Sequence, residues 1–115
     1  MARFSPVVWW ATSVEIHSAI SRLHREGEIN DAGKRTALGQ LEILRDAWQV
    51  ILPSDEARDR AEILIHQYPL RAADSLQLAA ALLWCSNRPA GKTFVSSDNR
   101  LCEAAARTGF TVVSP

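Results

Sequence analysis

The chain has 115 residues, a length typical of one domain built around one hydrophobic core. Lys plus Arg and Asp plus Glu number 13 each, so the formal net charge is zero. This balance excludes nucleic-acid binding that relies on the overall charge of the protein. A local basic patch or a metal ion would have to supply such binding.

Neither a signal peptide nor a membrane span is expected. The start, Met1–Pro6, has one Arg but no apolar region behind it, and the longest apolar run, Leu76–Cys85, is too short to cross a bilayer. The two cysteines, Cys85 and Cys102, do not suggest a disulfide framework, so we expect buried free thiols. These features indicate a cytoplasmic protein in which residues 1–115 form a single domain.

The first half of the chain predicts a strand, two helices and a second strand. The β-branched and aromatic run Val7–Trp10 predicts the first strand. A helix over about residues 12–25 follows, and a second helix begins at Asn30 or Asp31. Residues 48–52 predict the second strand. The apolar face of the second helix is expected to hold Ala37, Leu38, Leu41, Leu44 and Trp48.

The second half predicts two helices, a strand, a helix and a final strand. The first of these helices begins at residues 54–55, and the next, Ala72–Cys85, is apolar nearly all round, which is typical of a buried helix. Strands Thr93–Ser96 and Phe110–Val113 flank a helix that Asp98 caps. The inward residues of the helix at 54–55 are expected to be Ala57, Ala61, Leu64 and Ile65.

Strands that alternate with helices favour an α/β fold with a mostly parallel sheet. In such sheets, ligands bind beyond the carboxyl ends of the strands. Glu15 and Asp98 each lie just past a predicted strand, at the start of a helix. If the two strands are parallel, both carboxylates lie at one edge of the sheet. Asp74 lies in the first turn of the apolar helix and needs a partner or a metal, because an unpaired buried carboxylate is costly.

Each of the three acids also has an ordinary structural interpretation. Residues 12–15 fit a capping box in which Glu15 reaches back to the backbone of Thr12. Asp98 is a good N-cap residue, and Asp74 complements a helix dipole. Taken together, however, three acids at helix starts can converge on one cleft and bind Mg²⁺ or Mn²⁺. Such ions activate water and stabilise charge on a phosphate, so metal-assisted phosphodiester hydrolysis is the hypothesis.

Three blocks carry a resemblance to a known family. They are Val7–Leu23, which contains Glu15; Leu70–Ala81, which contains Asp74; and Phe94–Phe110, which contains Asp98. They resemble the PIN-domain family, in particular its VapC-like toxin ribonucleases, over nearly the whole chain. The second and third blocks are specific when taken together, whereas any one block alone would be weak.

The resemblance implies a three-layer α/β/α fold with a mostly parallel sheet and an endoribonuclease of toxin–antitoxin type. The enzyme would hydrolyse RNA phosphodiesters with a carboxylate-bound Mg²⁺ or Mn²⁺. Glu15, Asp74 and Asp98 would hold the metal, and Ser96 stands where the family often has a hydroxyl that supports the site. Many such proteins pair with a small antitoxin and form homodimers, so both partners are expected.

Several arginines could form a local basic rim for RNA phosphates, although a solvated surface is the ordinary alternative. The candidates for RNA binding are Arg22, Arg71 and Arg100, with Arg25 nearby.

The chain departs from the family pattern at its start. Family members usually begin with a central strand that ends in the first metal-binding Asp, and Met1–Pro6 does not match it. We therefore expect a PIN-like fold that is truncated at the N-terminus, through a start site assigned too late or a natural truncation. A second chain that completes the sheet is a further possibility.

Two other interpretations stay open. A catalytically inactive PIN-domain remnant would bind an antitoxin or self-associate. A receiver-like signalling domain would need clustered acids on an early strand and an Asp after a central strand, and neither is evident.

Overall fold

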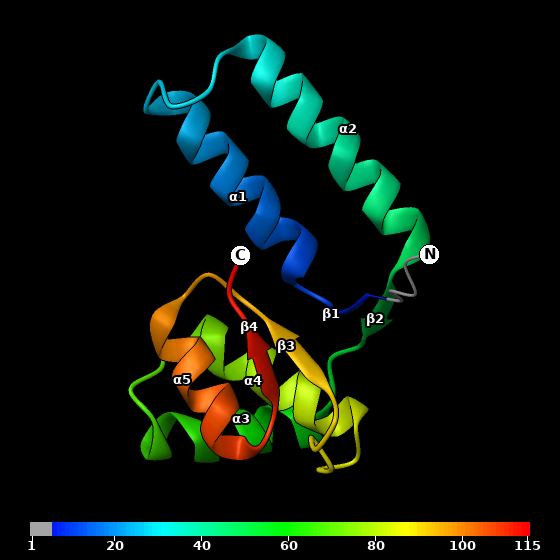
Figure 1. Cartoon of the computed structure of the whole chain (residues 1–115), viewed down its shortest axis with the longest axis vertical. Helices are drawn as coiled ribbons and strands as arrows, with labels where there is room; N and C mark the ends of the chain where they lie inside the picture. The colour runs from blue at the N-terminus through cyan, green and yellow to red at the C-terminus, as the bar shows by residue number, and fades with distance from the viewer. Residues whose placement is uncertain (1–5) are drawn as a thin grey trace. The chain divides into compact units, whose positions relative to one another are not determined.

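The computed structural model describes residues 6–115 (Figure 1). Within this part the chain forms five helices and four short strands, which confirms the predicted α/β class. The chain divides into two compact units, residues 1–50 (unit 1) and 51–115 (unit 2), and each is described by itself. The predicted absence of a first strand at Met1–Pro6 concerns residues 1–5, which lie outside the described residues.

Unit 1 is built around a helical hairpin (Figure 1). Its elements are β1 (Val7–Trp9), α1 (Thr12–Arg25), α2 (Asp31–Ala47) and β2 (Gln49–Ile51), whose last residue already belongs to unit 2. Strands β1 and β2 pair with each other. The Gly33 N–H donates to Asn30 Oδ1 (2.8 Å), so Asn30, one of the two candidates, caps α2. A contact between His24 Nε2 and Asp31 Oδ1 (2.7 Å) joins the two helices at the turn.

Few apolar side chains of unit 1 are buried. Among its described residues only Trp9, Ile20 and Leu41 are buried. Leu44 was predicted to face inward together with Leu41, but it is 47% exposed. The predicted apolar face of α2 is present, but among residues 6–50 only α1 is a second helix that can cover it. The remaining residues of the predicted face, Ala37, Leu38 and Trp48, are half-buried.

The start of α1 differs from the prediction. The helix begins at Thr12, its N-cap is Ala11, and no side chain caps it. The capping box proposed for Thr12 and Glu15 is therefore wrong, because Thr12 is already helical and the first helical hydrogen bond runs from Glu15 N to Ala11 O (3.1 Å). Glu15 is in the first turn of α1.

Unit 2 places three helices on one face of a two-stranded sheet (Figure 1). Strands β3 and β4 are parallel, with Thr93 opposite Thr111 and Val95 opposite Val113. Helix α5 connects them, which makes the βαβ crossover that parallel strands require. The elements of the unit are α3 (Asp55–Gln67), α4 (Ala72–Trp84), β3 (Thr93–Val95), α5 (Asn99–Thr108) and β4 (Thr111–Val113).

The two faces of the β3–β4 sheet have different surroundings. Phe94 and Val112 point inward and pack against the buried core, where the Phe94 ring lies 5.5 Å from that of Phe110. Val95 and Val113 point the other way and are 53% and 48% exposed. Within residues 6–115 the strands pair as β1–β2 and β3–β4 rather than in one sheet. The finer expectation of a three-layer arrangement therefore stays a prediction.

The core of unit 2 is centred on α4, as the apolar sequence of this helix predicts. Leu78 and Ala79 are completely buried. The hydroxyl of Ser75, also buried, donates to the Ala61 carbonyl of α3 (2.5 Å), which satisfies its polar atom and ties the two helices together. Ile65 of α3 was expected to face inward but is 37% exposed. The other buried apolar residues of unit 2 are Ala57, Ala61, Leu64, Leu70, Ala80, Leu82, Leu101, Ala104, Ala105 and Phe110.

The cysteines and the lengths of the helices were also predicted from the sequence. Cys85 and Cys102 are free thiols, as expected, but each is half-buried rather than buried. No helix within residues 6–115 is both long and apolar enough to cross a bilayer.

The contrast between neighbouring residues of α3 gives a stability test. Leu64 is 2% exposed and Ile63 is 55% exposed. Leu64→Ala should lower the free energy of unfolding by about 2–5 kcal/mol, because it removes buried methyl groups and leaves a cavity. Ile63→Ala should lower it by less than about 1 kcal/mol, because most of its side chain is already in water. Urea denaturation followed by circular dichroism measures both, and equal losses would contradict the packing described here.

Candidate functional site

Asp74 lies at the beginning of α4, where the chain enters the most apolar helix of unit 2. The N-cap of this helix is Arg71, which makes no side-chain cap, and Asp74 is in the first turn. The Asp74 side chain is only 13% exposed, and its Oδ2 lies 3.5 Å from Arg71 Nε. The expectation that this acid needs a partner is met by an ion pair with an arginine three residues earlier.

Asp98 reaches the same arginine from a different element. Its Oδ1 accepts a hydrogen bond from the Leu101 N–H (2.9 Å), so Asp98 caps α5 as predicted. Its Oδ2 lies 3.6 Å from Arg71 Nη2. One carboxylate therefore does two things: one oxygen caps the helix and the other meets Arg71.

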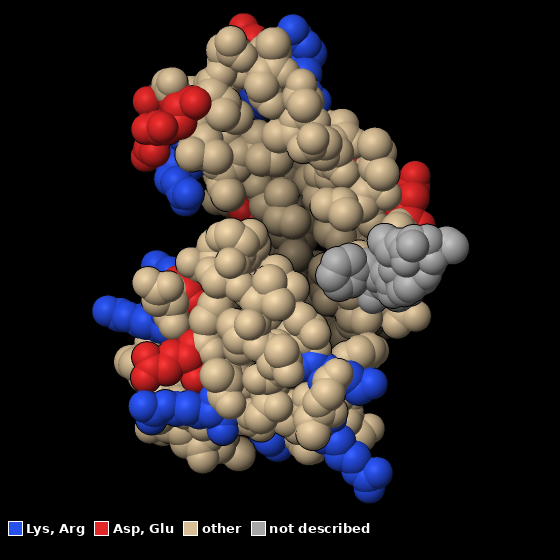
Figure 2. Space-filling model, viewed as in Figure 1, with Lys and Arg blue, Asp and Glu red and all other residues tan. Residues whose placement is uncertain are grey.

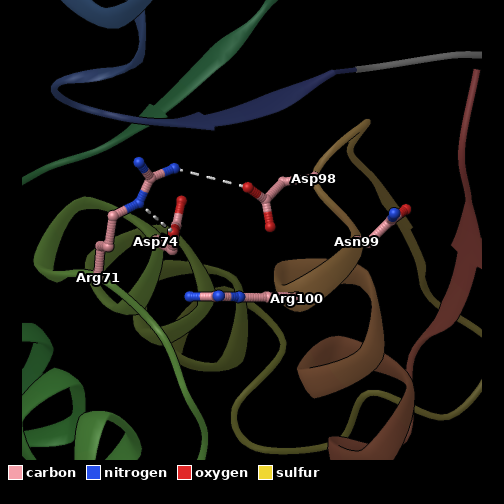
Figure 3. A pocket seen from close by; sticks show the side chains of 5 residues that line it. All are labelled: Arg71, Asp74, Asp98, Asn99 and Arg100. Atoms are coloured by element: carbon pink, nitrogen blue, oxygen red, sulfur yellow. Dashed lines mark ion pairs between the residues drawn. The ribbon is translucent and has the colours of Figure 1, made fainter.

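These side chains line a pocket of about 390 Å³ (Figure 3). The guanidinium of Arg71 pairs with both Asp74 and Asp98, and Arg100 points toward the same space from α5. Asn99 also lines the pocket but points away from the other side chains shown. Two carboxylates and two guanidinium groups give the lining a formal charge of zero.

Ser96 fixes the turn that carries Asp98. Its Oγ accepts a hydrogen bond from the Asp98 N–H (3.0 Å), and its own N–H donates to the Val113 carbonyl of β4 (3.2 Å). The Ser96 carbonyl also accepts a hydrogen bond from Cys102 Sγ (3.1 Å). Because the turn is tied to both the sheet and α5, the Asp98 carboxylate has little freedom to move away from the pocket.

The structure brings five of the seven predicted site residues together in unit 2. Asp74, Asp98, Arg71 and Arg100 line the pocket, and Ser96 supports it. Glu15 and Arg22 lie on α1 of unit 1, so their part in the same site stays a prediction. Among the described residues, strands β1 and β3 belong to different sheets. A shared sheet edge therefore does not bring Glu15 to the side of Asp98.

The donor set of the pocket suits a hard divalent cation. Two carboxylates converge on one positive group, and Mg²⁺ is often held by one or two carboxylates while it keeps several water ligands. No cluster of three or more His, Cys, Asp or Glu side chains arranged to hold a metal occurs within residues 6–115. A cation at this pocket would have two protein carboxylates, those of Asp74 and Asp98, and would complete its shell with water.

Sequence reasoning missed the second contact of Arg71, its ion pair with Asp98, together with the pocket position of Asn99. The pairing of Arg71 with Asp74 was recognisable, since residues three apart on a helix are neighbours. The contact with Asp98 carries no local signal, because 27 positions separate the two residues and only tertiary packing joins them.

Comparison with known protein families, curated proteins and solved structures finds no match to this chain.

The double use of Asp98 predicts different effects for two substitutions. Asp98→Ala removes the cap of α5 and should lower the free energy of unfolding by about 1 kcal/mol. Asp98→Asn keeps an oxygen that can accept from the Leu101 N–H, so stability should change by only a few tenths, about 0.3 kcal/mol. Chemical denaturation compares the two variants. A loss in Asp98→Asn as large as in Asp98→Ala would show that charge, not capping, is what stabilises this end of the helix.

Proposed function

We propose that this chain is a PIN-like, metal-dependent endoribonuclease of toxin–antitoxin type. The observation that carries the proposal is the convergence of Asp74 and Asp98 in one pocket of unit 2, where both reach the same guanidinium. These acids come from the two sequence blocks that together most specifically resemble the family.

In this proposal Asp74 and Asp98 hold a Mg²⁺ or Mn²⁺ ion, with Glu15 as a third carboxylate. When bound, the ion supplies positive charge that polarises a phosphodiester and lowers the pKa of water near it. Asp98 would hold the ion with Oδ2, because its Oδ1 accepts a hydrogen bond from the Leu101 N–H. Ser96 keeps the turn in position through the Asp98 N–H, so it acts as a positioning residue.

RNA binding rests on a few arginines and the cation rather than on a broad basic surface. Arg71 and Arg100 line the pocket and can contact phosphate oxygens there, and Arg22 on α1 is a further candidate. On the face of unit 2 shown in Figure 2, blue Lys and Arg side chains are interspersed with red Asp and Glu side chains. The zero formal net charge agrees with this pattern, so affinity for RNA should depend on the divalent ion.

The proposal includes the partners and the location that the resemblance implies. These are a small antitoxin protein, a second copy of the chain, and the cytoplasm. Support for self-association comes from exposed apolar side chains on the helices of unit 1, notably Val14 (68%) and Ile43 (72%). Large apolar side chains that are exposed in this way can be covered by association with another surface.

A second function, from a different class, is a catalytically inactive remnant that binds an antitoxin or itself. The observation that favours it is that Arg71 already pairs with both acids of the pocket, while unit 2 contributes no third carboxylate to it. RNA cleavage separates the two functions.

We expect the chain to cleave RNA with Mn²⁺ or Mg²⁺ and to lose activity in Asp74→Asn. The loss should exceed the roughly 10- to 100-fold cost of removing a group that merely supports a metal ligand. Asp59→Asn is the matched control, because it makes the same change at an exposed acid of α3. A gel assay with a labelled RNA mixture measures all three proteins, with a chelator as the metal-free reference.

Equal cleavage by the parent chain and Asp74→Asn would refute the assigned site. If none of the proteins cleaves RNA with either metal, the inactive binding function replaces the enzyme.

For the homodimer, sedimentation equilibrium should give a mass near twice that of one chain. Ile43→Glu should shift the equilibrium toward the monomer, because it places a charge within the exposed apolar surface of unit 1. A clean monomer of the parent chain at high concentration would refute dimerisation.

A further inference from the structure

The carboxylates of Asp74 and Asp98 are much less exposed than the Arg71 side chain that pairs with them. Asp74 is 13% exposed and Asp98 is 35% exposed, but Arg71 is 78% exposed. Asp98 is also held through its cap on α5 and through Ser96. The positive group can therefore leave toward solvent without any movement of the acids.

The contacts of Arg71 are ion pairs rather than hydrogen bonds. At 3.5 and 3.6 Å, its nitrogen–oxygen distances exceed the range of a good N–H···O bond. The arginine of these pairs is 78% exposed, so water screens its charge, and holding its long side chain in one place costs rotamer freedom. The backbone of Arg71 is anchored separately, since its carbonyl accepts from the Ser75 N–H (2.9 Å).

The charge of Arg71 is also only half of what the two acids require. Two carboxylates carry two negative charges, and one guanidinium neutralises one of them. A divalent cation between the same oxygens neutralises both. It also binds oxygen at shorter distances, about 2.0–2.2 Å for Mg²⁺ and ions of similar size.

We propose that Arg71 is an exchangeable counter-ion: it pairs with Asp74 and Asp98 in the metal-free protein and must leave both before a divalent cation binds there. The proposal rests on the proposed function, because it assumes the same two acids as metal ligands. After exchange, the pocket contains the divalent ion together with Arg71 and Arg100 against two carboxylates. Its net charge rises from zero to plus two, which suits the phosphate group of an RNA substrate.

The test measures Mn²⁺ affinity directly, without activity, by calorimetric titration and by the electron paramagnetic resonance signal of free Mn²⁺. The proteins are the parent chain, Arg71→Gln, Arg100→Gln and Asp74→Asn. Arg100→Gln is the matched control: it removes one positive charge from the same pocket, yet no ion pair found within residues 6–115 involves Arg100. Circular dichroism checks that each variant is folded.

Arg71→Gln should bind Mn²⁺ more tightly than the parent chain, by roughly 2- to 30-fold, which corresponds to the loss of two exposed ion pairs. Arg100→Gln should produce a smaller increase, because it removes a repulsion from the pocket without breaking an ion pair. Equal increases in the two variants would overturn the exchange, since general charge would then explain both. Unchanged or weaker binding by Arg71→Gln would overturn it as well.

A separate comparison, between the parent chain and Asp74→Asn, tests the proposed metal site. If the parent chain binds no Mn²⁺, or binds it as well as Asp74→Asn does, then Asp74 is not a ligand and the exchange falls with the metal site. If the parent chain binds and Asp74→Asn does not, the metal site stands, and the comparison of Arg71→Gln with Arg100→Gln alone decides the role of Arg71.

Discussion

The attraction between Arg71 and two carboxylates, Asp74 and Asp98, is the interaction on which the candidate site depends. It joins the start of α4 to the start of α5 across the edge of unit 2. The side chain of Asp74 is only 13% exposed, and a buried carboxylate without a partner is costly. Arg71 supplies the positive charge in the protein alone, and in the proposed function a metal ion takes its place.

The geometry of the site comes from ordinary structural devices that serve a second purpose. Asp98 caps a helix with one oxygen, and this cap orients the other oxygen toward Arg71. Ser96 follows β3: its N–H donates a hydrogen bond to the Val113 carbonyl of β4, and its Oγ accepts one from the Asp98 N–H just before α5. Asp98 can therefore cap α5 with one oxygen and still have its other oxygen available for a cation.

The two proposed functions differ in what happens at this pair of acids. In the enzyme, the carboxylates exchange Arg71 for a divalent ion, and the freed arginine adds positive charge beside the phosphate. In the inactive protein, the ion pairs with Arg71 are permanent and the exposed surfaces carry the function. The two cases differ in which interaction is stronger. If two carboxylates bind Mn²⁺ more strongly than they attract Arg71, the exchange occurs; otherwise the ion pairs persist.

The sequence by itself determined the secondary structure of most of the chain and the roles that depend on near neighbours. The helical periodicity, the cap at Asp98 and the burial of α4 follow from local patterns, and the structure confirms them. The sequence also predicted where α2 and α3 begin to within one residue. The capping box at Thr12 and the inward positions of Leu44 and Ile65 were wrong. Periodicity indicates which side of a helix can be buried, but what covers that side is a property of the packed protein.

Only the tertiary structure decided which strands pair and which acids share a pocket and an arginine. Strand pairing and the contact between Arg71 and Asp98 join residues far apart in the chain, and no local propensity encodes them. Sequence reasoning placed Asp74 and Asp98 at helix starts because caps and first turns have short-range signatures. Their convergence on one guanidinium depends on how α4 and α5 pack around the shared core, which is a long-range outcome of burying apolar surface.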